Sequence, residues 1–192
     1  MPYNYNQICF DLVKNLPPRT KDVVSRRFGL KKKNPETLQA VGNSYNITRE
    51  RVRQIEADGF KKIKPALANY QNILDHFYNH IKDWGGLKRE DKLLSDLGEE
   101  KLKNQVFFLL ALGDPFERHL ECRDYHTLWT VERNSLPTAE KVINSLTSKL
   151  NKIKTPLSEQ ELFDILQKEN ANSGASNLTI KSLSSFLDVS KK

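Results

Sequence analysis

The chain has 192 residues, 38% of them hydrophobic, and a formal net charge of +7. This length and apolar content are sufficient for one large domain or two to three small ones. No apolar run approaches the roughly 18 to 20 residues of a transmembrane helix, and the amino terminus lacks the pattern of a signal peptide, so we expect a cytoplasmic protein without membrane contact.

The positive charge is concentrated in the first third of the chain. Residues 1–64 hold fourteen Lys and Arg against six Asp and Glu, or +8, whereas residues 65–192 hold seventeen against eighteen, or −1. A positive field favours polyanions, and nucleic acid is the commonest such partner in the cytoplasm, so we expect the protein to be nucleoid-associated. The alternative is a solvated, lysine-rich surface that binds nothing.

The first third of the chain is predicted to form a series of short helices. Ile8–Lys14 and Thr20–Phe28 lie on either side of NLPPR, whose prolines fix a turn and then suit a helix start. A basic loop, FGLKKKNPE, follows. Thr37 is expected to cap a third helix that ends near Ser44, and after the turn YNI, Thr48 is expected to cap a fourth.

The fourth predicted helix has two chemically distinct faces. At 100° per residue, Val52, Ile55 and Ile63 fall on the core side. The opposite side, which we call the reading face, carries Arg49, Glu50, Arg53, Gln54 and Ala57. Phe60 lies off the apolar stripe, and Gly59 is expected to weaken the helix by roughly 1 kcal/mol relative to Ala.

Two short helices joined by a tight turn, with Arg, Glu and Gln in the first turns of the second, indicate a helix-turn-helix that enters the major groove. Arg binds guanine in a bidentate fork, Glu accepts from cytosine and Gln pairs with adenine. We therefore expect a target with adjacent G·C and C·G pairs. The alternative is an ordinary amphipathic surface helix with salt-bridged charges.

The segments LPPRTKDVVSRRFGL and TLQAVGNSYNITRERVRQIEADGFKKIK resemble region 4 of the bacterial sigma-70 family. The resemblance covers about residues 10–64, and TRERVRQIE is its most specific part. It implies a domain that reads the minus-35 promoter element and docks on the flap of the RNA polymerase β subunit. Two positions depart from the family pattern: Ala40, where an acidic residue or Gln is usual, and Gly59, where a helix former is usual.

The resemblance also assigns contacts to double-stranded promoter DNA. Arg49, Glu50 and Gln54 are expected to contact bases, with Thr48 and Arg53 nearer the phosphates. Further candidates for contact with the DNA backbone or with polymerase are Arg19, Arg26, Lys31, Lys32 and Lys33. No segment resembles the sigma region that melts the minus-10 element, so the chain is not expected to start transcription alone.

Residues 65–136 are predicted to form a helical connector and a winged-helix domain. Apolar residues at helical spacing run from Leu67 to Ile81, and Gly85-Gly86 ends that helix. The elements expected after it are two helices and a hairpin turn, at Glu90–Leu97, Lys101–Leu112 and Cys122–Asp124. The order helix, helix, hairpin indicates a winged helix.

Residues 137–192 are predicted to form a small helical unit. One helix follows Pro137, Ser158 and Glu161 form a capping box for a second, and Thr179 caps a third. The segments PLSEQELFDIL and LTIKSLSSFLDVS resemble the small winged-helix modules of bacterial polymerase delta subunits, in which case the module is truncated here. With the 1–64 helix-turn-helix domain, the predicted fold class is mainly α.

The sequence predicts neither an enzyme nor a metal site. It has no Gly-rich phosphate loop, nucleophile elbow or paired-carboxylate motif, so no catalytic residue, cofactor or small-molecule substrate is expected. The two groups weighed as metal ligands, and expected to hold no metal, are His76 with His80 and His119 with Cys122 and His126. Cys9 and Cys122 are expected to be buried or half-buried thiols.

Two functions therefore remain open. The first is a sequence-specific transcription factor that reads a minus-35-type element and docks on RNA polymerase core. The second is a polymerase accessory or anti-sigma-like protein that binds the β flap without reading DNA. Arg49, Glu50 and Gln54 favour the first, and the nearly neutral residues 65–192 indicate protein contacts rather than DNA contacts there.

Overall fold

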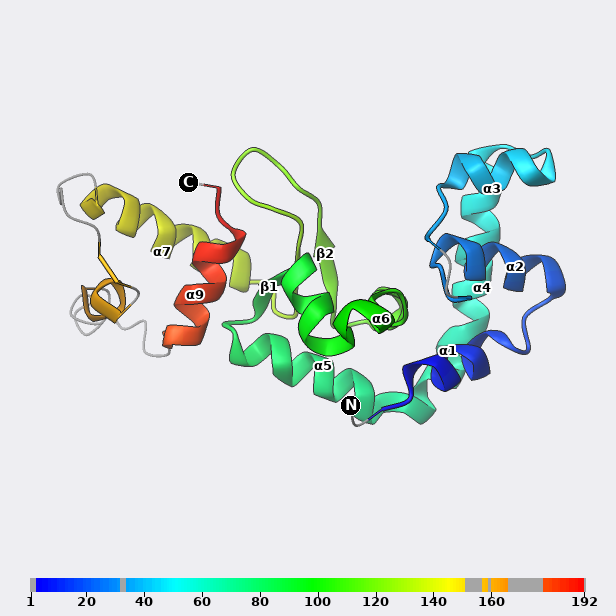
Figure 1. Ribbon diagram of the computed structural model, residues 1–192, viewed down its shortest axis with the longest axis horizontal. Helices are drawn as coiled ribbons and strands as arrows, with labels where there is room; N and C mark the ends of the chain where they lie inside the picture. Colours follow the sequence, from blue (N-terminus) through cyan, green and yellow to red (C-terminus); the bar gives the residue numbers. More distant parts are fainter. Residues whose placement is uncertain (1–2, 32–33, 151–156, 159, 166–177, 192) are drawn as a thin grey trace. The chain divides into compact units, whose positions relative to one another are not determined.

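The structure is a computed structural model that describes residues 3–31, 34–150, 157–158, 160–165 and 178–191. Helices make up most of this described part, which contains one small sheet (Figure 1). The prediction of a mainly α protein is confirmed. The chain divides into two compact units: unit 1 is Met1–His76 with Leu94–Gly113, and unit 2 is Phe77–Leu93 with Asp114–Lys192. The boundaries 1–64, 65–136 and 137–192 stay a prediction.

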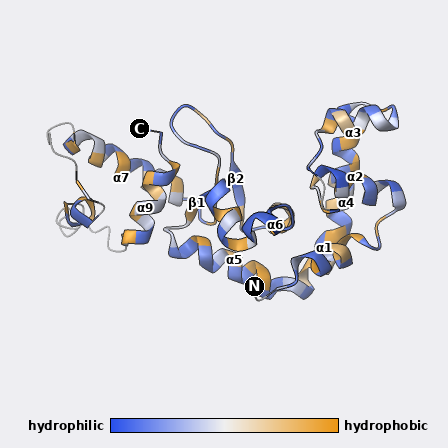
Figure 2. Cartoon of the chain, in the orientation of Figure 1, coloured by the Kyte–Doolittle hydropathy of each residue, from blue (hydrophilic) through white to orange (hydrophobic). Residues whose placement is uncertain are grey.

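Unit 1 is built from amphipathic helices, most of which lie in the first part of the chain (Figure 2). They are α1 (Tyr5–Val13), α2 (Pro18–Arg27), α3 (Leu38–Tyr45), α4 (Arg49–Leu67), the 3-10 turn η1 (Ala68–Tyr70) and the start of α5 (Gln71–Asp83). The first two begin earlier than predicted, because the Asn4 side chain caps α1 and Pro18 occupies the first turn of α2. α4 continues past Pro65, where its predicted sequence pattern ended.

The helix-turn-helix consists of α3, a tight turn and α4, and both predicted caps are confirmed. The hydroxyl of Thr37 accepts from the Ala40 amide at 3.1 Å, and that of Thr48 accepts from the Arg51 amide at 3.2 Å. Asn46 ends α3 in the left-handed conformation, with φ of 52°. Local signals therefore determine where both helices start.

Gly59 is a site of close packing between α2 and α4, a role that its expected cost in helix propensity did not indicate. A Cβ at this position would lie 2.9 Å from Cγ2 of Thr20 and 3.1 Å from Cγ2 of Val24. Both of these side chains are β-branched and therefore stiff. Phe60, which lies off the apolar stripe, packs against Phe28 with ring centroids 5.4 Å apart.

Replacing Gly59 with Ala is expected to lower the free energy of unfolding by up to about 2 kcal/mol. The gain in helix propensity, roughly 1 kcal/mol, is smaller than the overpacking penalty of about 1–3 kcal/mol. Urea unfolding followed by circular dichroism measures the difference. Asp58→Ala is the matched control, since Asp58 is exposed on the same helix. A more stable Gly59→Ala protein would contradict the packing argument.

Unit 2 contains the sheet of strands β1 (Leu87–Arg89), β2 (Glu117–His119) and β3 (Leu128–Thr130). Its order is β1-β3-β2 and both pairings are antiparallel, with Leu87 and Glu117 each opposite Thr130. β1 was not predicted. The helices around the sheet are α7 (Ser135–Leu150), a short helix at 160–165, and α9 (Ile180–Val189). The core between them includes Leu87, Leu128, Ala139, Ile143, Phe186 and Val189.

Several predicted ends of elements in unit 2 are confirmed. Gly85 and Gly86, with φ of 85° and 78°, follow the end of α5. Ser158 and Glu161 form the reciprocal bonds of a capping box, and the Thr179 hydroxyl caps α9. α7 begins before the predicted Pro137, since proline is tolerated in a first helical turn.

α6 (Glu90–Leu112) joins the two helices that were predicted at 90–97 and 101–112. Glu99 interrupts it with φ of 47° and ψ of −173°, so the two-part prediction is close to the structure. Residues 90–93 belong to unit 2, whereas 94–112 belong to unit 1. The second part of α6 therefore belongs to unit 1.

The two cysteines differ in exposure. Cys9 is buried, as expected, whereas Cys122 is exposed in the loop between β2 and β3, which corrects the prediction for that thiol. In the described ranges, no three His, Cys, Asp or Glu side chains are placed to hold a metal ion. No described helix combines the length and apolar character needed to cross a bilayer.

Candidate nucleic-acid interface

The reading face of α4 is exposed along its whole length. Arg49, Glu50, Arg53, Gln54 and Ala57 are all exposed. On the other side of the same helix, Val52, Ile55 and Ile63 are buried. Because the apolar side is fixed in the core, the polar side is held outward. The predicted two-faced helix is therefore confirmed.

Glu50 and Arg53 form an ion pair on this face. Arg53 Nη2 and Nε donate to Glu50 Oε1 and Oε2 at 2.7 and 2.9 Å. Both side chains are more than half exposed, so the pair contributes little to stability and can exchange for groups of a partner. The bond from Arg53 lowers the pKa of Glu50, which keeps that carboxylate an ionised hydrogen-bond acceptor.

Arg51 contacts the reading face through its side chain, although its Cα lies on a different side of α4. Its Nη1 donates to Gln54 Oε1 at 2.9 Å. Arg51 therefore orients a predicted base-contacting side chain, and a change at Arg51 is not neutral for the reading face. Helical periodicity places the Cα atoms correctly, but it does not describe where a long side chain ends.

The beginning of α4 adds a favourable field for anions. Thr48 caps the helix, so its hydroxyl already accepts one bond from within the protein. The positive end of the helix dipole lies at the same end as Arg49 and Glu50. Phosphate contact through backbone amides and the exposed arginines is therefore compatible with the geometry.

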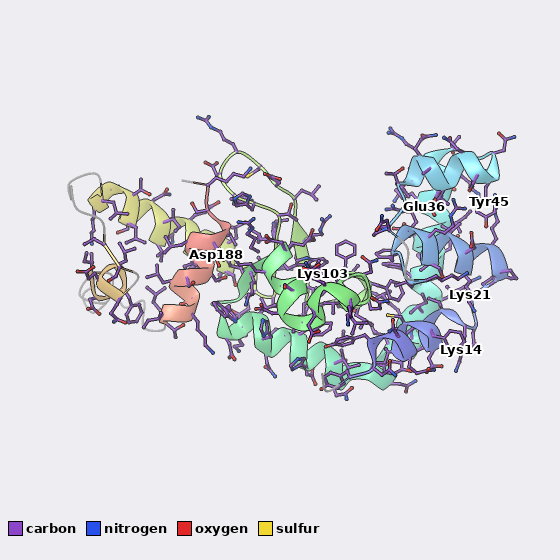
Figure 3. The ribbon with its side chains drawn as sticks, in the orientation of Figure 1. Lys14, Lys21, Glu36, Tyr45, Lys103 and Asp188 are labelled. Carbon is purple, nitrogen blue, oxygen red and sulfur yellow. The ribbon has the colours of Figure 1, made fainter. Side chains whose placement is uncertain are left out.

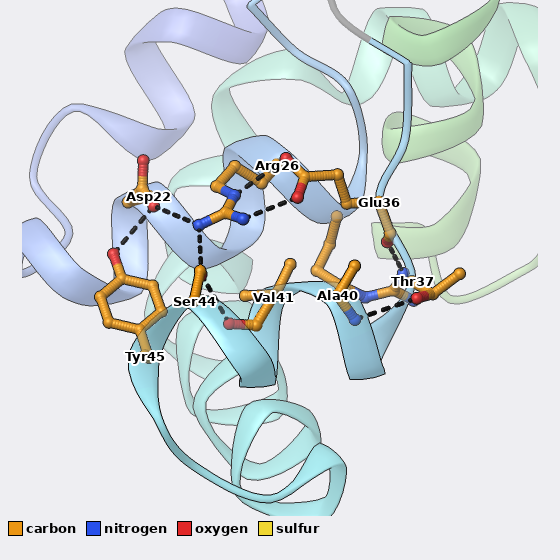
Figure 4. A network of polar contacts seen from close by, with 9 residues as sticks. Asp22, Arg26, Glu36, Thr37, Ala40, Val41, Ser44 and Tyr45 are labelled. Atoms are coloured by element: carbon orange, nitrogen blue, oxygen red, sulfur yellow. Dashed lines mark hydrogen bonds and ion pairs between the residues drawn. The ribbon is translucent and has the colours of Figure 1, made fainter.

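Arg26, a candidate DNA contact from the sequence, belongs to a network of hydrogen bonds and ion pairs with other side chains of the region (Figure 4). Its Nε and Nη2 donate to the two carboxylate oxygens of Glu36 at 2.9 and 2.6 Å, and Nη1 donates to Ser44 Oγ at 2.7 Å. Asp22 accepts from the Tyr45 hydroxyl at 2.8 Å and lies 3.7 Å from Arg26 Nη1. The hydrogen bond with Glu36 raises the pKa of Arg26. Arg26 thus ties α2 to α3.

Arg27 makes a second set of internal bonds beside this network. It donates to the backbone carbonyl of Glu36 and, through Nε, to Glu56 Oε2 of α4 at 2.9 Å. Arg26 and Arg27 together hold both helices of the helix-turn-helix against α2. Sequence reasoning did not identify Glu36, because its partners lie ten residues away across a loop. The i, i+4 spacing of Asp22 and Arg26 was a signal that could have found Asp22.

The remaining basic candidates differ in their surroundings. The Arg19 guanidinium lies over the ring of Tyr45, 5.0 Å from its centroid. Lys31 is exposed just after α2, and Lys32 and Lys33 lie outside the described residues. Three lysines of unit 1 away from the reading face are labelled in Figure 3. Lys14 is paired with Asp11 and Lys103 with Glu100, whereas the Lys21 ammonium lies over the ring of Phe10.

Comparison with known proteins identifies the helix-turn-helix. Residues 12–64 match the family model described as Sigma-70, region 4. Residues 12–64 form a sigma-70 region 4 module. The resemblance predicted from TRERVRQIE and its surroundings is therefore confirmed, and we call these residues the region 4 module.

Curated relatives match the same part of the chain. RNA polymerase sigma factor SigA of Nostoc sp. is 42% identical over 53 residues, which are 28% of this chain and 14% of that protein. RNA polymerase sigma factor SigA of Clostridium acetobutylicum is 43% identical over 53 residues, which are again 28% of this chain and 14% of that protein. RNA polymerase sigma factor RpoD of Neisseria gonorrhoeae is 36% identical over 59 residues, 31% of this chain and 9% of that protein. This chain therefore covers between 9% and 14% of the length of these relatives.

Proposed function

We propose that the region 4 module binds double-stranded promoter DNA of the minus-35 type and associates with RNA polymerase core. The observation that carries this proposal is the capped helix α4, whose polar reading face is exposed while its apolar face is buried. An exposed face with two arginines, a glutamate and a glutamine has the side chains that direct readout requires. The protein acts in transcription as a binding protein and not as an enzyme.

Individual side chains have distinct roles in this proposal. Arg49 binds guanine, Glu50 accepts from cytosine, and Gln54 contacts an adjacent base. Arg53 leaves Glu50 and contacts a phosphate, together with the first turn near Thr48. Arg26 is not included among the DNA contacts, because its guanidinium is bonded to Glu36 and Ser44.

The rest of the chain has a proposed architecture as well. The order α5, β1, the two parts of α6, β2 and β3, with a sheet ordered β1-β3-β2, supports a winged-helix fold for residues 65–136. Residues 137–192 are proposed as a further small helical unit. The near-zero net charge of residues 65–192 favours protein contacts in this part.

Arg49→Ala and Glu50→Ala test the reading face. The target is first obtained by selecting bound duplexes from a random pool with the full chain. Arg49→Ala is expected to weaken binding to that target by about 1–3 kcal/mol and to leave random duplexes nearly unaffected. Glu50→Ala is expected to relax the preference for cytosine at one position and to hold or raise nonspecific affinity, because an anion is removed. Fluorescence anisotropy at one salt concentration measures both.

Lys62→Ala is the control, because it removes one positive charge from the same helix on the side away from the reading face. It is expected to leave the discrimination between target and random duplexes unchanged. If Lys62→Ala reduced discrimination as much as Arg49→Ala, the helix would be docked through another face. If no target emerged from the selection, the alternative function, a polymerase accessory or anti-sigma-like protein that does not read DNA, would be supported instead.

The polymerase part of the proposal has its own test. We expect intact RNA polymerase core to retain the full chain in a pull-down, and core without the β flap to retain much less. Equal recovery with both would remove flap docking while leaving the DNA proposal in place. Resemblance to the sigma factors is the reason for expecting this partner.

A further inference from the structure

The second part of α6 covers an apolar face of the region 4 module. Phe28 at the end of α2 lies 5.8 Å from Phe107 and 5.2 Å from Phe108, measured between ring centroids. Phe60 of α4 lies 6.0 Å from Phe108 in an edge arrangement. Edge and offset arrangements are favourable for aromatic pairs. We call Phe28, Phe60, Phe107 and Phe108 the aromatic cluster; it joins two helices of the module to α6.

Polar contacts fix the position of α6 on this face. The Asn104 side chain donates to the carbonyl of Gly29 at 3.3 Å, and the Gln105 side chain donates to Asn6 Oδ1 at 2.8 Å. The Cys9 thiol donates to the backbone carbonyl of Gln105 at 3.9 Å. The contact surface therefore extends from α1 through the end of α2 to α4. The amide side chains of α6 supply the polar contacts to this surface, and its two phenylalanines supply the apolar ones.

Two features oppose the docked state of α6. Within the described residues, the buried Oε1 of Gln105 has no hydrogen-bond partner, which is unfavourable for a buried polar atom. Glu99, at the start of the docked part, has φ of 47° and ψ of −173°, a conformation that only glycine adopts without strain. A helix that stays packed permanently would not require an unpaired buried oxygen or a strained backbone. Both make detachment of α6 less unfavourable.

The covered face and the reading face lie on different parts of α4. Phe60 is eleven residues beyond Arg49, or about 16 Å along the helix. The reading face is exposed while α6 is in place. DNA reading and α6 docking are therefore compatible, whereas a second helix cannot occupy the covered face at the same time as α6.

We propose that residues 100–112 of α6 are a built-in, releasable partner of the region 4 module, which occupies its apolar face and closes that face to helices of other proteins. Release occurs about Glu99 without unfolding of the module. A partner that binds this face must displace a helix bearing Phe107 and Phe108. The inference does not depend on whether the reading face binds DNA.

Cys9 provides a direct probe of release. It lies under α6, it is 2% exposed, and burial raises the pKa of its thiol to about 12. The chain has two cysteines, so Cys122→Ser leaves Cys9 as the single thiol. In this background the rate of reaction with a small aromatic disulfide reagent reports how often the thiol becomes accessible.

Phe107→Ala in the single-thiol protein is expected to increase the labelling rate of Cys9 by about tenfold or more, because a contact that holds α6 is lost. Phe116→Ala is the matched control, since Phe116 packs against Phe77 in unit 2. It is expected to leave the rate within about twofold. Equal rates in Phe107→Ala and the parent protein would overturn the proposal.

The dependence of labelling on urea separates release from global unfolding. Release exposes less surface than global unfolding, so the rate is expected to rise less steeply with urea than global unfolding does, below the unfolding transition. A rate that follows the full urea dependence of global unfolding would overturn the proposal. Glu99→Gly relieves the backbone strain of the docked state and is expected to slow labelling by about threefold to tenfold. An unchanged or faster rate would exclude Glu99 as the point of release.

Discussion

Replacing Phe108 with Ala is expected to lower the free energy of unfolding of unit 1 by about 3–5 kcal/mol. The side chain is fully buried and contacts Phe28 and Phe60. Its removal loses apolar burial and leaves a cavity that rigid aromatic neighbours fill poorly. Most single substitutions destabilise a protein by less, so the loss identifies a packing centre.

Denaturant unfolding followed by circular dichroism measures this loss. Phe108→Leu keeps most of the volume and is expected to lose about half as much. Phe10→Ala is the exposed control, because Phe10 is 56% exposed and the Lys21 ammonium lies 5.3 Å from the centroid of its ring. We expect its effect to stay within about 0.5 kcal/mol. A loss below about 1 kcal/mol for Phe108→Ala would show that α6 does not support the region 4 module.

Elements that depend on local chemistry were predicted well. Thr37, Thr48 and Thr179 each satisfy an amide at a helix start, which requires only a hydroxyl and three following residues. Gly85 and Gly86 end α5 because their positive φ angles suit residues without a side chain. Such signals are contained in a few consecutive letters of the sequence.

Elements that depend on distant residues were not predicted. β1 is three residues long and exists because it pairs with β3, some forty residues later. Gly59 lowers helix propensity, but it lets α2 approach α4, and the neighbours that explain it are Thr20 and Val24. In both cases the reason for the structure lies across the fold, and no local pattern contains it.

The candidate site shows the same division. The period of 3.6 residues placed the reading face correctly, because a helix packed on one side must expose the other. It did not distinguish an arginine that points into solvent from one bonded to distant side chains of the same protein. Arg49 and Arg26 have the same side chain, but the guanidinium of Arg26 is bonded to Glu36 and Ser44. Contacts between side chains decide which cations are available to DNA.

α4 combines two tasks along its length. Its first turns present the reading face, and its later turns, with Gly59 and Phe60, hold α2 and α6. Because a helix is stiff over this distance, the packing at the later turns fixes the direction in which the first turns point. Substitutions at Gly59 or Phe108 are therefore expected to affect DNA binding through the orientation and stability of α4.

Binding of the full chain to random duplex DNA is expected to weaken by about 100-fold between 50 and 200 mM salt. About four phosphate contacts give a slope near −3.6 for the logarithm of the binding constant against the logarithm of salt concentration. The expectation follows from the +8 charge of residues 1–64. Lys61 is one of the expected contacts, since it is exposed on the side of α4 that carries Glu50 and Gln54, about 18 Å along the helix from Arg49.

Lys61→Gln is therefore expected to reduce the magnitude of this slope by about 1, because one fewer counterion is released. Arg133→Gln removes one charge from an exposed position of unit 2 and is expected to leave the slope unchanged. Anisotropy titrations at five salt concentrations determine the three slopes. A slope near zero for the parent chain would mean that its basic residues are merely solvated. Equal reductions for the two variants would mean that unit 2 contacts DNA as closely as α4 does, and that charge asymmetry along the chain does not locate the interface.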